Sequence, residues 1–63
     1  MNNLQQLEFK LKLAQLKNFD QLDEAFSDHD FTSKFTTFIH GKIGKLWLNG
    51  PRSKRFKDWQ KSY

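Results

Sequence analysis

The sequence predicts an all-α fold in which a helical hairpin is followed by a short C-terminal helix, and three observations favour it. Apolar residues recur at three- and four-residue steps over residues 31–49, as on one side of a helix. Residues 4–19 are rich in the strong helix formers Leu, Gln, Lys, Glu and Ala. The basic C-terminal segment, residues 52–63, has aromatic residues at helical spacing. With 63 residues, the chain has the length of a single domain, 1–63.

The first region, residues 4–19, carries two competing patterns. Apolar residues alternate with charged ones from Leu7 to Leu13, which is typical of a half-buried strand. Helical spacing is also present, in a stripe that consists of Leu4, Leu7, Leu11 and Ala14. The composition favours the helix, and the strand stays open as the alternative.

A second apolar stripe of this helix is formed by Phe9, Leu13 and Leu16. A hairpin covers one face of a helix, so a second apolar face would be left uncovered. We therefore expect these three residues to form an association face. Its partner would be a second copy of the chain, giving a homodimer, or a different protein.

A second, shorter helix is expected after this region, because Asn18 or Asp20 can act as its N-cap. Acidic residues near its start complement the helix dipole, which explains them without any function. The buried side of this helix would consist of Phe19, Leu22, Ala25 and Phe26.

The third region, residues 31–49, has the strongest helical pattern of the chain, and both its ends are marked. Asp30 stands where an N-cap residue belongs. At the other end, Asn49 or Gly50 can adopt the left-handed conformation that ends a helix, and Pro51 prevents its continuation. The sequence therefore predicts a helix over about 31–49.

Two glycines complicate this long helix, since Gly41 and Gly44 each cost about 1 kcal/mol relative to Ala in a helix interior. The alternative is a helix that ends near His40, followed by a short strand over residues 42–48. We favour one helix, because both glycines lie opposite the aromatic stripe. There, another backbone could approach closely, or the face could simply be solvated. Past Pro51, Ser53 can cap a last short helix whose apolar side consists of Phe56, Trp59 and Tyr63.

The composition limits the class of protein. There is no cysteine, so neither a disulfide nor a thiolate metal site can stabilise so small a domain, and self-association is the remaining common device. No apolar run is long enough for a signal peptide or a membrane span. We expect a cytoplasmic protein without a membrane span.

Positive charge is concentrated towards the C-terminus. The net charge is +4, and residues 41–63 contain one acidic residue, Asp58. The cations of this segment are Lys42, Lys45, Arg52, Lys54, Arg55, Lys57 and Lys61. Trp59 lies among them, where it could stack on bases or dock the last helix.

Catalytic and metal-binding patterns are weak. Asp28, His29 and Asp30 have the residue types of metal ligands but not the spacing of a known site, and a capping loop explains them better. His40 lies eleven residues beyond His29, with no third or fourth ligand evident. We expect no enzymatic activity, no metal and no cofactor.

The sequence thus predicts a non-enzymatic regulatory or binding module. The favoured partner is nucleic acid, either DNA or RNA, bound by the seven cations and Trp59. The alternative is a small helical inhibitor or adaptor that binds a larger protein with an acidic surface, through its apolar helix faces and basic tail. A non-functional interpretation is that the charges are solvated, or pair with the acidic residues between 20 and 30.

Overall fold

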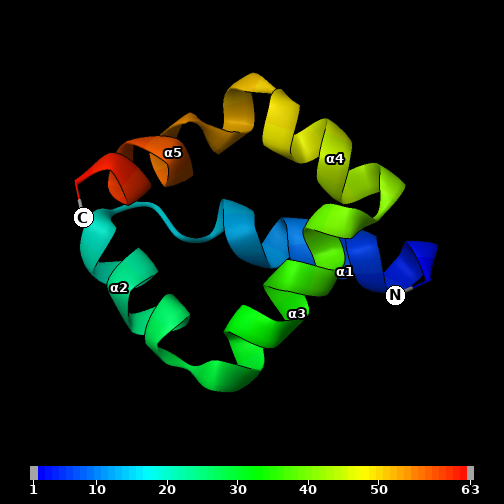
Figure 1. Ribbon diagram of the computed structural model, residues 1–63, viewed down its shortest axis with the longest axis horizontal. Helices are drawn as coiled ribbons and strands as arrows, with labels where there is room; N and C mark the ends of the chain where they lie inside the picture. Colours follow the sequence, from blue (N-terminus) through cyan, green and yellow to red (C-terminus); the bar gives the residue numbers. More distant parts are fainter. Residues whose placement is uncertain (1, 63) are drawn as a thin grey trace.

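The computed structural model describes residues 2–62, which form five α-helices, one short 3₁₀ helix and no strand. In chain order these are α1 (Asn3–Ala14), α2 (Phe19–Ser27), α3 (His29–His40), α4 (Lys42–Asn49), η1 (Pro51–Ser53) and α5 (Lys54–Lys61). In Figure 1, α2 to α5 follow one another around the rim of the view and α1 crosses its middle. The helices α2 and α5 are in contact, so the two ends of this path meet. The expected all-α class is confirmed.

Helix α1 begins with a capping box and covers the segment for which a strand was the alternative. The Asn2 side chain accepts a hydrogen bond from the amide of Gln5, and the Gln5 side chain accepts one from the amide of Asn2. Two of the amides that a helix start leaves without partners are thereby satisfied. The alternation between Leu7 and Leu13 is accidental.

The face of α1 that packs inward is not the expected one. Phe9 and Leu13 are buried in the core of their own chain, and Leu16 is half-buried against it. The expectation that they form an uncovered association face is therefore wrong. The exposed stripe is the opposite one, with Leu4 and Leu11 each about two-thirds exposed. Periodicity reveals both stripes of a helix but not which of them meets the rest of the chain.

The caps of α2 and α3 are side chains of the preceding residue. Asn18 Oδ1 accepts a hydrogen bond from the amide of Gln21 at 2.9 Å, which confirms Asn18 as one of the two expected caps of α2. Asp28, rather than the expected Asp30, caps α3, and its carboxylate accepts from the amide of Asp30 at 2.9 Å. The helix therefore begins two residues earlier than its apolar stripe indicates.

The expected helix over 31–49 is two helices, α3 and α4, which meet at Gly41. Gly41 has an extended backbone, with φ −83° and ψ 165°. A β-carbon at Gly41 would overlap the side chain of Gln6, and one at Gly44 would overlap the carbonyl oxygen of Phe38. Both glycines are thus sites where another segment approaches closely. The alternative with a helix ending at His40 was right about the break, although a helix and not a strand follows it.

The turn from α4 into α5 differs in two ways from expectation. Gly50 is extended, with φ −92°, and no residue among those described has a left-handed backbone, so α4 does not end in the expected left-handed cap. Ser53 makes no cap bond with its side chain. It is fully buried, and its hydroxyl donates to the carbonyl oxygens of Leu48 and Gly50, at 2.8 and 2.9 Å. Ser53 therefore holds the turn together instead of capping α5.

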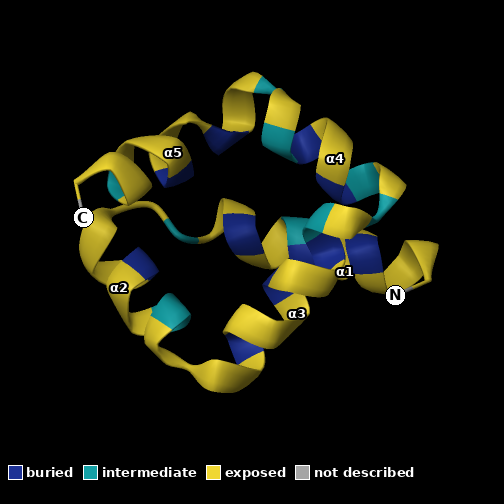
Figure 2. Cartoon of the chain, in the orientation of Figure 1, coloured by how far each residue is buried: buried dark blue, intermediate teal, exposed yellow. Residues whose placement is uncertain are grey.

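The core is made mainly of aromatic rings from α1, α3, α4 and α5, and the half-buried ring of Phe26 on α2 packs against them. Figure 2 shows the buried parts of the helices turned towards the middle of the molecule. Phe38 has no exposed surface, and Phe35 contacts the rings of Phe9, Trp47 and Phe56 at centroid distances of 4.9–6.3 Å. Such ring pairs add stabilisation beyond the area that they bury. Tyr63, expected on the apolar side of the last helix, lies outside the described residues.

Candidate nucleic-acid interface

The C-terminal cations face solvent. All seven are exposed, namely Lys42, Lys45, Arg52, Lys54, Arg55, Lys57 and Lys61. None of them forms an ion pair with another described residue, because the ion pair found among the described residues joins Lys34 to Asp30 within α3. Helix α5 does fold back onto α2, which carries acidic residues, but within residues 2–62 no ion pair joins these cations to the carboxylates of residues 20–30.

Helix α5 turns its aromatic residues inward and its cations outward. Phe56 is buried and contacts Trp47 and Phe35. On a helical wheel, Lys54, Lys57 and Lys61 lie opposite Phe56, at i, i+3 and i+7. Five cations of η1 and α5, which we call the basic face, are thus presented on one short segment: Arg52, Lys54, Arg55, Lys57 and Lys61.

Trp59 has a structural role in the described fold. Its ring stacks on Phe26 at a centroid distance of 5.0 Å and an interplanar angle of 29°. Its Nε1 donates a hydrogen bond to the Asp23 carboxylate at 2.7 Å. These contacts join α5 to α2 and leave the ring half-buried. Of the two roles open to Trp59, the geometry favours docking over stacking on a base.

Several of the cations stand where the helix dipole opposes them. Lys54 and Arg55 occupy the first turn of α5, and that turn contains no acidic residue. Lys42 is also at a helix start, because α4 begins there. In one continuous helix over residues 31–49, Lys42 would instead lie in the C-terminal half. Cations are favoured at helix C-termini and disfavoured at N-termini. Local helix stability therefore does not explain these three positions.

Lys42 and Lys45 are separate from the basic face. They lie on α4, whereas the basic face lies on η1 and α5, beyond the turn at Gly50. Figure 1 shows that the start of α4 is far from α5 along the rim of the molecule. The fold thus divides the seven cations into a group of five and a group of two.

An open groove of about 650 Å³ runs beside the basic face. Its lining residues come from the second half of α1, the start of α2, Trp47 of α4, Pro51 and Arg52, and the first residues of α5. Its polar rim consists of Lys10, Arg52, Lys54, Arg55 and Asp58. The apolar part of the lining consists of Leu11, Leu13, Ala14, Leu16, Phe19, Leu22, Trp47 and Phe56. The groove thus combines mainly positive charges with an apolar lining.

Several groove residues, among them Lys10 and Phe19, were not expected to belong to a site. Lys10 was assigned to the alternating pattern of the first region, and Phe19 was assigned to the buried side of α2. Phe19 is instead 40% exposed and lines the groove. No local signal identifies it, because the groove exists only when α1 and α5 come together.

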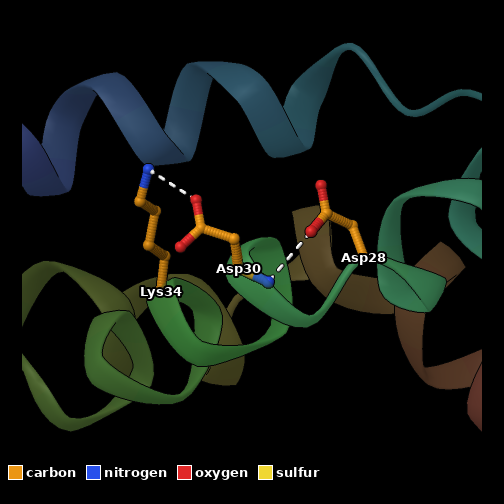
Figure 3. A network of polar contacts seen from close by, with 3 residues as sticks. All are labelled: Asp28, Asp30 and Lys34. Carbon is orange, nitrogen blue, oxygen red and sulfur yellow. Dashed lines mark hydrogen bonds and ion pairs between the residues drawn. The ribbon is translucent and has the colours of Figure 1, made fainter.

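The acidic residues at the start of α3 have a structural role. Figure 3 shows Asp28 directed at the amide of Asp30, and the carboxylate of Asp30 paired with Lys34. The Asp30 to Lys34 ion pair measures 3.4 Å and spans one helical turn. Residues 2–62 contain no group of three or more His, Asp or Glu side chains that could hold a metal ion. Within the same range, every helix is too short or too polar to cross a membrane.

Comparison of the chain with models of known protein families, with curated proteins and with solved structures gave no match.

Proposed function

We propose that this chain is a non-enzymatic nucleic-acid-binding module that contacts phosphates through the basic face. The observation that carries the proposal is the set of five exposed cations within the ten positions 52–61, none of which is paired with a described carboxylate. Two of them, Lys54 and Arg55, occupy a helix start where their charge is unfavourable. A binding role explains this placement, since the cost to the free helix is offset when an anion is bound.

A phosphate backbone suits this surface because its charges repeat along a line. Lys54, Lys57 and Lys61 follow one another along α5, and Arg52 and Arg55 extend the positive surface towards the groove. Each Lys or Arg that neutralises a phosphate releases a counterion, so affinity falls steeply with salt. Phosphate contacts of this kind carry no sequence information. The proposed activity is accordingly electrostatic and independent of base sequence.

The test is binding of fluorescent oligonucleotides, followed by fluorescence anisotropy over a series of salt concentrations. With four phosphate contacts on duplex DNA, log affinity should fall against log salt with a slope of about −3.6. A variant in which the five cations of the basic face are replaced by Gln should not bind, while circular dichroism shows an unchanged helical protein. Exposed charges contribute little to stability, so the two properties are separable.

A matched pair of double variants controls for net charge. Lys54→Gln with Lys57→Gln removes two charges from the basic face, and Lys12→Gln with Lys34→Gln removes two from α1 and α3. The first pair should weaken binding strongly and the second only slightly. Equal losses would show that overall charge and not this face attracts the nucleic acid, and undetectable binding at low salt would refute the proposal.

A protein partner is the second candidate, and the exposed stripe of α1 favours it. Leu4, Leu7 and Leu11 are 66%, 48% and 65% exposed, on the side of α1 opposite the core. In the simplest case, two copies would cover each other's stripes. Light scattering should then show a dimer that Leu4→Ser with Leu11→Ser converts to a monomer of unchanged melting temperature. A monomer at high protein concentration would contradict self-association.

A further inference from the structure

The groove beside the basic face has features that a duplex backbone does not require. Phosphates need only exposed cations, and α5 already presents these outside the groove, through Lys57 and Lys61. The groove adds apolar lining residues and a cation from another helix, Lys10 of α1. Its volume of about 650 Å³ falls in the range of roughly 300–1,000 Å³ that is usual for sites holding small organic molecules.

Phe19 gives this groove an aromatic surface that is open to a ligand. Phe19 is 40% exposed, whereas Trp47 and Phe56, the other two rings of the lining, are 8% and 7% exposed. Trp59 does not line the groove, and its ring is stacked on Phe26. Among the aromatic residues that line the groove, Phe19 is therefore the one with a ring available for stacking.

We infer that the groove receives unstacked bases, which makes single-stranded nucleic acid the substrate of this module; this inference rests on the proposed function. The phosphates follow the cations of α5 and Arg52, and a base turns inward between Lys10 and Arg55 to lie on Phe19. Aromatic stacking surfaces beside a positively charged track are the common means of binding single strands without sequence preference. Bases in a duplex are stacked and paired, so their faces cannot reach such a surface.

Asp58 on the rim fits this assignment better than a purely phosphate-binding one. Its carboxylate repels a phosphate that lies close to it, but it can accept a hydrogen bond from the amino group of a base. A groove lined by Lys10, Arg52, Lys54 and Arg55 carries a net positive rim even with Asp58 included. The rim therefore attracts the chain of phosphates while leaving an acceptor for a base edge.

The experiment compares a fluorescein-labelled 15-nucleotide single strand with the matching 15-base-pair duplex. The single strand should bind more tightly to the unaltered chain. Phe19→Ala should lower single-strand affinity roughly 5- to 150-fold, as expected for the loss of one stacking contact, and leave duplex affinity unchanged. Phe19→Trp should restore single-strand binding, because a larger ring in the same place still stacks.

Leu46→Ala serves as the matched control, since Leu46 is an exposed apolar residue at 69% that lies outside the groove. It should change neither affinity, and melting followed by circular dichroism shows whether each variant is folded. A different result would be that Phe19→Ala has no effect and that both probes are lost only when the basic face is removed. That result would support the proposed function and overturn the single-strand assignment. If a labelled acidic amphipathic peptide binds through Phe19 and neither oligonucleotide binds, the groove is a protein site and both proposals fail.

Discussion

Gln6 on α1 accepts a hydrogen bond at its Oε1 atom from the backbone amide of Ile43 on α4, at 3.1 Å. The N-cap residue of α4 is Gly41, which has no side chain to satisfy the first amides of the helix. The Gln6 side chain, 6% exposed, therefore serves as the cap of a helix 37 positions away in the sequence. This hydrogen bond holds the junction between α3 and α4 against α1.

Replacing Gln6 by Met tests this distant cap. Met has a similar size but no acceptor of this kind, so the part-buried amide of Ile43 would lose its partner, at a cost of about 1–3 kcal/mol in the free energy of unfolding. Chemical denaturation followed by circular dichroism measures it. Gln15→Met, at an exposed position on the end of the same helix, should change stability by less than about 0.5 kcal/mol. Equal effects of the two substitutions would contradict the cap.

Gly44→Ala separates the observed helix pair from one continuous helix. In an unobstructed helix interior this change stabilises by up to about 1 kcal/mol, because Ala is the better helix former. Here the new β-carbon would overlap the Phe38 carbonyl oxygen, which is backbone and cannot move aside, so we expect destabilisation. The melting temperature should fall. As a control, Ser33→Ala at an exposed site within α3 should raise the melting temperature slightly. If Gly44→Ala also raised the melting temperature, α3 and α4 would not cross closely.

Trp59 should prove to be a stabilising residue rather than a ligand-binding one. Trp59→Phe keeps a ring against Phe26 but removes the hydrogen bond to Asp23. Because this bond is exposed to solvent, the free energy of unfolding should fall by only about 1 kcal/mol. Trp59→Ala should cost about 2–3 kcal/mol, less than a fully buried ring. Affinity for nucleic acid, corrected for the folded fraction, should stay the same in both variants. A lower affinity in folded Trp59→Phe would assign this ring to the binding surface.

Stability and binding should respond in opposite directions to charge at the start of α5. Lys54→Glu and Arg55→Glu place acidic residues in the first helical turn, where the dipole favours them. The melting temperature should rise by at most a few degrees, given roughly 4–8 °C per kcal/mol in a domain of this size. Oligonucleotide binding should weaken in the same variants.

Lys61→Glu is the control for this effect, because it places an acidic residue in the last turn of α5, where the dipole opposes it. Binding should weaken as before, and the melting temperature should now fall. A fall for all three substitutions would mean that the cations at the start of α5 stabilise the fold, which removes the argument that their placement reflects binding.

Much of this structure can be predicted from the local sequence. The helical class, the cap of α2 by Asn18 and the buried stripe of Phe31, Phe35 and Phe38 follow from residues within a few positions of one another. The exposure of the basic face is predictable in the same way, since Lys and Arg side chains lose hydration when they are buried. Each of these features depends on the residues of a single helix and on their contact with water.

Tertiary contacts decided the features that no single segment contains. Phe9 and Leu13 face the core, and Leu4 and Leu11 face solvent, because the other helices pack on one side of α1 and not the other. At the break, Gly41 leaves room for the side chain of Gln6, and Gly44 leaves room for the Phe38 carbonyl where α3 and α4 cross closely. The groove with Phe19 arises from α1, α2 and α5 together. Helical spacing predicts which residues lie on the same side of a helix. Only the tertiary structure determines whether that side packs on the core or faces solvent.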